Sequence, residues 1–498
     1  MRRLLPLLLA LLTAAALVAG CGSSTSSSSS ADDPARAVPA SSLVYAAVQV
    51  RPEGDAKSGI EAAGRKILAG KELGPELQRL IDKGLKSKNL SYGSDIAPWL
   101  GRRAAFAVTG YGASTPDVIL AVNSTDDAKA ADFLKKVSKN DHKESYKGVD
   151  YSSSSSSAVG VTDGYLLVGS TPAAFKTAVD TVKGGSSLAD SSTYKDAVSK
   201  VTTDGLGLFF VDTKRFIDVL GQTSQGAQAL SQLKSLPQFR DLKPTAAAMT
   251  ADGDAIRVEA PTPPNTDEST ADAVAKLPAN SWLAIAAPKA GEQIRAQLNS
   301  LSGTQRQQFE QVKRLFREQT GLDLDADILR WIKGVSIFAT GTTLPDLKAG
   351  IVLDSSDPAA SRRALDKIAA LLARQQGAPL RRTADGFEIA TPQGPITFTV
   401  TGDRVLIAFG KDAKAALDGS DKLEGSDTYK EAQKALGGGR PAFLVSVPTI
   451  VQFAQNLGAR NNSGYLKVEP YLKAFGALTS GIVETGGKKI SRLAIGLR

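Results

Sequence analysis

The chain has 498 residues, of which 42% are hydrophobic and 22% are charged, and its formal net charge is +9. A single hydrophobic core rarely serves a chain of this length, so two domains are expected, and the composition is that of an ordinary folded soluble protein. One histidine and one cysteine exclude an intramolecular disulfide and any metal site built from clusters of these residues.

The N-terminus has the pattern of a lipoprotein signal peptide, which we predict to span residues 1–20. Arg2 and Arg3 precede an apolar run at residues 4–18, shorter than the roughly 20 residues needed to cross a bilayer. The run ends in the sequence VAGC, whose cysteine is Cys21. Small residues before a cysteine form a lipobox, so Cys21 is expected to be acylated and to become the new N-terminus. The alternative is an ordinary secretory signal with an incidental cysteine.

A serine-rich tether is expected at residues 21–37, because such a segment cannot bury enough apolar surface to fold. Charge is unevenly distributed along the rest of the chain. Residues 22–276 contain 29 basic and 30 acidic side chains, whereas residues 277–498 contain 29 and 21. The basic second half suits anionic lipid or an anionic cell-wall polymer, although a solvated surface explains the excess as well.

Two related hexapeptides, STYKDA at residues 192–197 and DTYKEA at residues 427–432, belong to a series of matches that keep the same order in both halves. The matched segments are separated by between 229 positions (residues 116 and 345) and 239 positions (residues 38 and 277). A period of this length predicts two copies of a whole domain. We therefore expect repeats at residues 38–260 and 277–498, with a linker rich in proline and threonine at residues 261–276.

The first repeat alternates strands with helices and hairpins. Its apolar and β-branched runs predict strands at residues 42–50, 104–110, 117–123 and 205–210. Helices are predicted at residues 124–137 and at residues 59–85, with a break at Gly74 and Pro75. Turn residues at positions 163–164 and 252–253 predict two hairpins, and the hexapeptide reads as a helix start with a serine or aspartate cap.

The second repeat follows the same pattern, with hairpin turns at residues 402–403 and 486–487. A helix over residues 303–321 places four apolar residues on one face and basic residues away from it; the apolar residues are Phe309, Val312, Leu315 and Phe316. Short loops between neighbouring strands predict antiparallel pairing. The predicted fold class is therefore α+β, as two tandem duplicated domains, each a mainly antiparallel sheet with helices packed against it.

The motif DIAPWLG at residues 95–101 recurs as DILRWIKG at residues 327–334. Together with the lipobox, this repeated motif resembles an uncharacterised bacterial lipoprotein family known as domain of unknown function 3352. The second copy has one additional residue before its glycine. The resemblance covers most of the mature chain and implies an envelope location and this type of fold. The family has no assigned catalytic residues, so the resemblance implies no site residue.

Residues with catalytic or metal-binding chemistry are few. His142 lies in a polar stretch and is expected to be a solvated loop residue rather than a general base. The sequence DLDAD at residues 323–327 starts like a calcium loop, but Ile328 and Gly334 occupy positions that need glycine and glutamate, so Asp325 or Asp327 is expected to cap a helix. Residues 152–157 form a serine run that we interpret as a polar edge or loop. Recognised nucleophile-elbow and phosphate-loop motifs do not occur.

Trp99 and Trp331 occupy the same place in the two repeats and are the candidate binding aromatics. Such rings either line a ligand groove or fill the core, and we expect the core. The leading functional prediction is a non-enzymatic binding or scaffold protein, exported and lipid-anchored at Cys21 on the outer or periplasmic face of a membrane. It would need no cofactor or metal. Its expected partners, besides the membrane, are an envelope protein, a lipid or an anionic cell-wall polymer, and not nucleic acid.

Two alternatives stay open at this point. A carrier for a lipid or another hydrophobic ligand predicts an apolar cavity in each repeat. A serine hydrolase that works without histidine predicts a buried serine next to a lysine or an aspartate, within a cleft of one repeat only.

Overall fold

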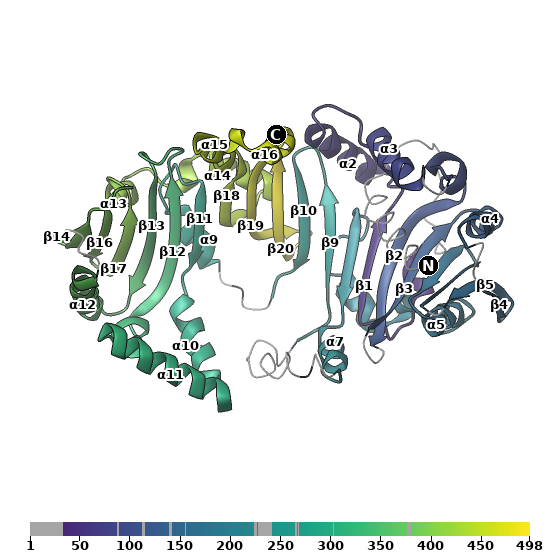
Figure 1. The fold of residues 1–498 in the computed structure, drawn as a ribbon, viewed down its shortest axis with the longest axis horizontal. Helices are drawn as coiled ribbons and strands as arrows, with labels where there is room; N and C mark the ends of the chain where they lie inside the picture. Colours follow the sequence, from purple (N-terminus) through teal and green to yellow (C-terminus); the bar gives the residue numbers. More distant parts are fainter. Residues whose placement is uncertain are drawn as a thin grey trace. The chain divides into compact units, whose positions relative to one another are not determined.

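The computed structural model describes residues 33–498 except 87–88, 112–114, 139–141, 155, 224–226, 228–241, 264–265, 267, 302 and 376–379. Cys21 and the serine-rich segment as far as residue 32 lie outside the described residues. The chain forms two compact units, the first ending at Pro261 and the second beginning at Thr262. Both combine antiparallel strands with helices, so the predicted α+β class is confirmed (Figure 1).

Ten described strands of the first unit form antiparallel pairs in a single sequence of neighbours. Across the sheet they follow the order β4 (His142–Tyr146), β5 (Val149–Ser154), β6 (Ser157–Thr162), β7 (Tyr165–Gly169), β3 (Pro116–Ser124), β2 (Leu100–Tyr111), β1 (Val44–Gln49), β8 (Gly207–Val211), β9 (Thr245–Ala251) and β10 (Ala255–Pro261). The predicted hairpins over residues 163–164 and 252–253 join β6 to β7 and β9 to β10.

The second unit has the same spatial order of strands. Its described strands are β14 (Leu380–Thr383), β15 (Gly386–Ile389), β16 (Ile396–Thr401), β17 (Arg404–Phe409), β13 (Lys348–Ser355), β12 (Ile332–Thr340), β11 (Leu283–Ala287), β18 (Arg440–Ser446), β19 (Phe475–Thr485) and β20 (Lys488–Leu497). Two copies of one domain would have this shared order. The duplication itself remains a prediction.

The helices of the first unit cover both faces of its sheet. One face is covered by η2 (Pro34–Ala37), α5 (Pro172–Val182), η5 (Leu188–Asp190) and α6 (Ser192–Val198), and we call it the hexapeptide face because α6 contains STYKDA. The opposite face is covered by α2 (Gly54–Ile67), α3 (Leu73–Leu85), η4 (Tyr92–Ile96) and α4 (Asp127–Val137). A further helix, α7 (Thr213–Leu220), has no buried residue.

The second unit covers its own hexapeptide face with α9 (Ser269–Ala275), α13 (Ala413–Asp418), η8 (Leu423–Gly425) and α14 (Asp427–Leu436), which contains DTYKEA. On the opposite face, η7 (Leu324–Leu329) and α12 (Pro358–Gln375) pack against the strands nearest β14. The remaining helices are α10 (Ala290–Ser300), α11 (Gly303–Thr320), α15 (Val447–Asn456), η9 (Ala459–Asn461) and α16 (Ser463–Leu472).

Each hexapeptide is a helix start in the structure. The side chains of Ser191 and Ser426 accept hydrogen bonds from the amides of Tyr194 and Tyr429, at 3.4 and 3.1 Å. A serine in this position satisfies an amide that has no partner inside the helix. Both tyrosine rings are buried against the hexapeptide face of their own unit. The repeated letters are therefore explained by local structure.

Both predicted flexible segments contain folded residues. The tether was expected to continue to residue 37, yet Asp33 caps η2, and Ala35 and Ala37 are fully buried. The linker was expected over residues 261–276, yet it includes α9, whose Val274 and Ala275 belong to the core of the second unit. Small apolar side chains pack closely enough to hold these short helices against the sheet. The prediction missed them because it relied on the serine and proline content of the two segments.

Three local predictions are wrong in detail. The helix expected over residues 59–85 breaks at residues 68–72 and not at Pro75. Pro75 lies in the first turn of α3, where backbone amides have no partner within the helix, so its missing amide hydrogen costs no helical hydrogen bond. Asp323 caps η7, in place of Asp325 or Asp327, by accepting hydrogen bonds from two amides. His142 is exposed as expected, but it lies in strand β4, paired with Ser153, and not in a loop.

Candidate functional site

Trp99 and Trp331 lie in the turns that follow η4 and η7, directly before β2 and β12. Each indole N–H donates to a backbone carbonyl four residues earlier, that of Asp95 at 2.8 Å and that of Asp327 at 2.7 Å. The two residues are only 2% and 4% exposed. Rings in this position contribute to the core and offer no surface to a ligand.

A lysine from the following helix braces each tryptophan turn. Lys136 Nζ lies 2.6 Å from a carboxylate oxygen of Asp95, and Lys367 Nζ lies 2.9 Å from the carboxylate of Asp327. The hydrogen bond from Lys136, together with those from the Ser91 amide and a serine hydroxyl, lowers the pKa of Asp95 to about 2. The Lys136–Asp95 pair thus fixes η4 against α4, and the Lys367–Asp327 pair fixes η7 against α12. Both pairs have a structural role.

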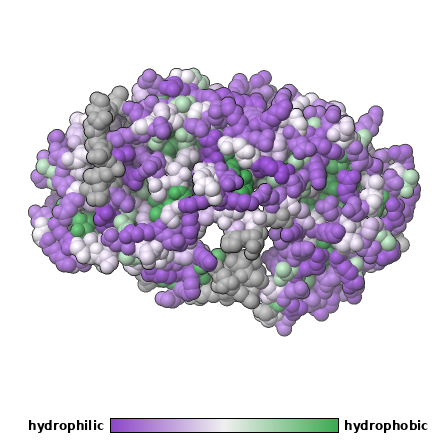
Figure 2. Space-filling model, turned by 180° about the vertical axis from the view of Figure 1, so that it is seen from behind, coloured by the Kyte–Doolittle hydropathy of each residue, from purple (hydrophilic) through white to green (hydrophobic). Residues whose placement is uncertain are grey.

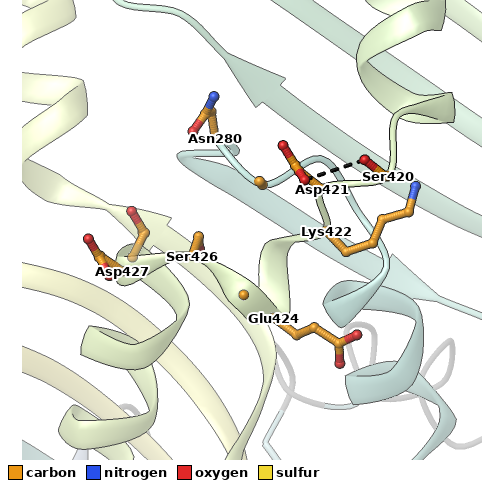
Figure 3. Close-up of a pocket in the computed structure, with 10 residues that line it drawn as sticks. Asn280, Ser420, Asp421, Lys422, Glu424, Ser426 and Asp427 are labelled. Carbon is orange, nitrogen blue, oxygen red and sulfur yellow. Dashed lines mark hydrogen bonds between the residues drawn. The ribbon is translucent and has the colours of Figure 1, made fainter.

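A polar hollow of about 730 Å³ lies beside the start of α14. Its carboxylates come from Asp421, Glu424 and Asp427, and Figure 3 shows them pointing in different directions. Ser420 donates to Asp421 at 3.4 Å, which is a long contact. Within the part of the chain that the structure describes, no group of three or more acidic, histidine or cysteine side chains is arranged to hold a metal ion.

One serine and one lysine do come together, in the first unit. Lys143 Nζ lies 2.6 Å from the hydroxyl of Ser152 and 3.3 Å from that of Ser138, beside a hollow of about 760 Å³. Counted from the hairpin turn, the same pair of positions in the second unit holds Leu380 and Ile389. The serine–lysine contact of the first unit therefore has no counterpart at the matching positions of the second.

The sheet face of the second unit opposite the hexapeptide face presents a row of apolar residues. Directly paired residues follow one another from strand to strand, in the order Ile407, Ile351, Ile337, Ile285, Phe443, Ser480 and Leu493. Of these, Ile285, Ile351 and Leu493 are 37%, 40% and 47% exposed. We call this row the open face.

The matching row of the first unit is covered at Leu120 but not along its whole length, because Phe209, which corresponds to Phe443, is 42% exposed. There Leu120 pairs with Phe106 in the same way that Ile351 pairs with Ile337, but Leu120 is only 1% exposed. It belongs to a cluster that includes four buried residues of α3, namely Leu73, Leu77, Ile81 and Leu85. Among the described residues of the second unit, the cluster on this face contains none from α10 or α11. The difference in exposure follows from which helices cover the sheet.

Exposed large hydrophobic side chains are concentrated in the second unit. Of the fifteen found among the described residues, twelve belong to it. Several lie on the helices α15 and α16 or directly after α15, and these are Ile450, Leu457, Leu466, Val468 and Tyr471. Hydrophilic residues cover most of the surface drawn in Figure 2, and apolar residues form small separate areas. An open row of large aliphatic residues is therefore unusual on this molecule.

Comparison with known proteins assigns the chain to a family. The model of a family described as "Protein of unknown function (DUF3352)" matches residues 4–479. The chain belongs to this family. The resemblance to domain of unknown function 3352 is thereby confirmed, whereas the lipoprotein character of the chain remains a prediction.

Two solved structures resemble the chain, crystal forms I and IV of TP0453. Their sequences are 8% and 10% identical to this chain, and both have a TM-score of 0.22. Each alignment covers 78% of this chain and 96% or 95% of the TP0453 chain. This TM-score is too low for either structure to bear on function. No curated protein matches the sequence. In the described residues, no helix combines the length and the apolar character needed to cross a membrane.

The open face was not predicted from the sequence. The signal was nevertheless present, because strand β11 reads LAIAA and β13 contains GIVL, with apolar residues on both sides of the strand. A strand that is apolar on both sides normally has helices over both of its faces. Only knowledge of where α10 and α11 pack reveals that this side of the strand stays uncovered.

Proposed function

We propose that this protein is an exported, non-enzymatic lipoprotein, anchored through an acylated Cys21, that binds an acyl-chain lipid on its open face. The exposure of Ile285, Ile351 and Leu493 is the observation that supports this proposal. Contiguous exposed apolar surface is costly in water and commonly marks a binding site. Of the two binding functions considered from the sequence, we favour the lipid carrier, with its ligand on this exposed row of the second unit and not in the apolar cavity expected in each repeat.

The shape of the open face suits a chain-like ligand. Its row crosses seven neighbouring strands, and strands lie about 4.8 Å apart, so the row extends for roughly 29 Å. A long, narrow row of isoleucine, phenylalanine and leucine side chains, interrupted by Ser480, matches an extended hydrocarbon. Each methylene group buried there would contribute about 0.8 kcal/mol.

Charge favours a lipid with an anionic head group. From residue 277 onward the basic residues outnumber the acidic ones by eight (29 against 21). A positive excess of this kind attracts anionic head groups and repels cationic ones. We therefore take a fatty acid or an anionic phospholipid as the ligand.

The test measures binding of a fluorescent fatty acid at concentrations below micelle formation. Ile285→Lys and Ile351→Lys should each weaken binding by about tenfold, since each places a charge in the apolar row. Leu80→Lys is the matched control, because Leu80 is 52% exposed on α3 of the first unit. Parent-like binding by both open-face variants would contradict the proposal, as would absence of binding by the parent.

The same proposal takes the Lys143–Ser152 pair to be structural. Ser152 lies in the middle of three strands, paired with Lys143 on one side and Val159 on the other. Acyl transfer also needs hydrogen-bond donors free to face a developing oxyanion, and the amides of such a strand serve the sheet. A fluorophosphonate probe should therefore leave Ser152 unmodified, as judged by mass spectrometry of the labelled protein. Labelling that is lost in Ser152→Ala would establish the hydrolase instead.

A further inference from the structure

The helix α11 differs from its counterpart in the first unit. Both α3 and α11 lie between the first two central strands of their unit, in the orders β1–α2–α3–η4–β2 and β11–α10–α11–η7–β12. Five residues of α3 are buried, whereas α11 has none over its eighteen residues. In Figure 1, α11 lies beyond the ends of its unit's strands, at the lower edge. Among the described residues, α11 therefore buries no side chain against its own sheet.

The sequence of α11 separates apolar from basic residues around the helix. Phe309, Val312, Leu315 and Phe316 form one stripe. The residues outside it include four basic and two acidic side chains, namely Arg306, Lys313, Arg314, Arg317, Glu310 and Glu318. Val312 and Leu315 are 54% and 48% exposed. A helix with an apolar stripe, a basic polar face and low overall hydrophobicity is typical of helices that lie in the interface of a bilayer.

Ion pairs hold α11 in this position. Lys313 contacts the carboxylate of Asp325 in η7, and Arg317 contacts that of Asp323, which caps η7. Arg306 donates to the backbone oxygen of Leu301 at 3.1 Å. These contacts fix the polar side of the helix to its own unit and leave Val312 and Leu315 uncovered.

We infer that α11 is a membrane-surface helix, which inserts Val312 and Leu315 among the acyl chains of an anionic bilayer while Arg314 meets the lipid head groups. Arg314 is exposed and makes no ion pair with any described residue, so it is available to a phosphate. The positive excess of the second half supports an anionic surface over a neutral one. This contact is separate from the acylated Cys21 and from ligand binding on the open face.

The experiment is co-sedimentation of the mature chain from residue 22, which lacks the acylated cysteine, with vesicles. We expect binding to vesicles of phosphatidylcholine mixed with phosphatidylglycerol, weaker binding to phosphatidylcholine alone, and a decrease with added salt. The double variant Val312→Asp/Leu315→Asp should lose about tenfold or more in vesicle affinity, because two apolar contacts are removed. Arg314→Glu should weaken binding to the anionic vesicles only.

Leu80→Asp is the matched control, since it places the same charge at an exposed leucine of α3, and it should bind like the parent. Absence of parent binding to anionic vesicles, or equal binding by the double variant, overturns the inference. The inference is also overturned if the parent binds no vesicles but self-associates with rising concentration, and the double variant does not. That result would assign the apolar stripe to contact with a second copy of the chain. The double variant should keep its affinity for the soluble fatty acid, so this inference and the proposed ligand site can fail separately.

Discussion

A buried indole that also donates a hydrogen bond is costly to remove, because truncation leaves both a cavity and an unpaired carbonyl. Trp99→Ala and Trp331→Ala should each lower the free energy of unfolding by about 3–5 kcal/mol, as measured in urea. Trp282→Ala is the control, because Trp282 is only half-buried, stacked on Phe453, and should cost less. If both core variants unfold within about 0.5 kcal/mol of the parent, these rings are not core residues.

The carboxylate of Asp95 makes the stability of the first unit depend on pH in the acidic range. Its pKa is lowered to about 2 by Lys136 and its other donors, from an unfolded value near 4. A carboxyl group whose pKa is lower in the folded than in the unfolded protein stabilises the fold at a pH above the unfolded pKa. This stabilisation is lost as the pH falls through the folded pKa. The difference in unfolding free energy between the parent and Asp95→Asn should therefore be full at pH 7 and should shrink between about pH 4 and pH 2. A difference that stays constant over this range would exclude the ionic brace.

At the scale of elements, the sequence predicts what is local and misses what depends on distant packing. The caps at Ser191 and Ser426 and the hairpin at residues 486–487 follow from a few neighbouring residues, so they are predictable. The helix α11 was also predicted, including its apolar stripe. Its lack of cover was not, because an amphipathic stripe looks the same whether it faces a sheet, a membrane or another chain.

The open face illustrates the same limit. Every residue of strand β11 is apolar, yet the exposure of Ile285 depends on α10 and α11, which are close in sequence but do not cover it. The Lys143–Ser152 contact joins two strands across a hairpin, and the sequence indicated the serine run without its partner. Contacts that depend on register and helix placement lie outside what residue patterns determine.

At the scale of the whole molecule, the proposed anchor at Cys21 would determine where any ligand is met. Cys21→Ser should prevent acylation and move the protein from the membrane fraction to a soluble or unprocessed form, because a serine hydroxyl is not the substrate of lipobox processing. Cell fractionation with immunoblotting, and mass spectrometry of the mature N-terminus, measure the outcome. A mutant that remains membrane-bound as a processed protein without lipid would show that the lipobox prediction is wrong.

Two buried tryptophans, one per unit at matching turns, have an optical consequence. The chain contains only three tryptophans, so Trp282→Phe leaves one indole in each unit. Each remaining indole sits in an apolar environment with its N–H bonded to a carbonyl, and its emission should shift to the red when that environment is lost. Replacing either of these two tryptophans then leaves the other as the single intrinsic fluorophore of its own unit. The melting of each half can thus be followed within the intact chain, with no dye attached.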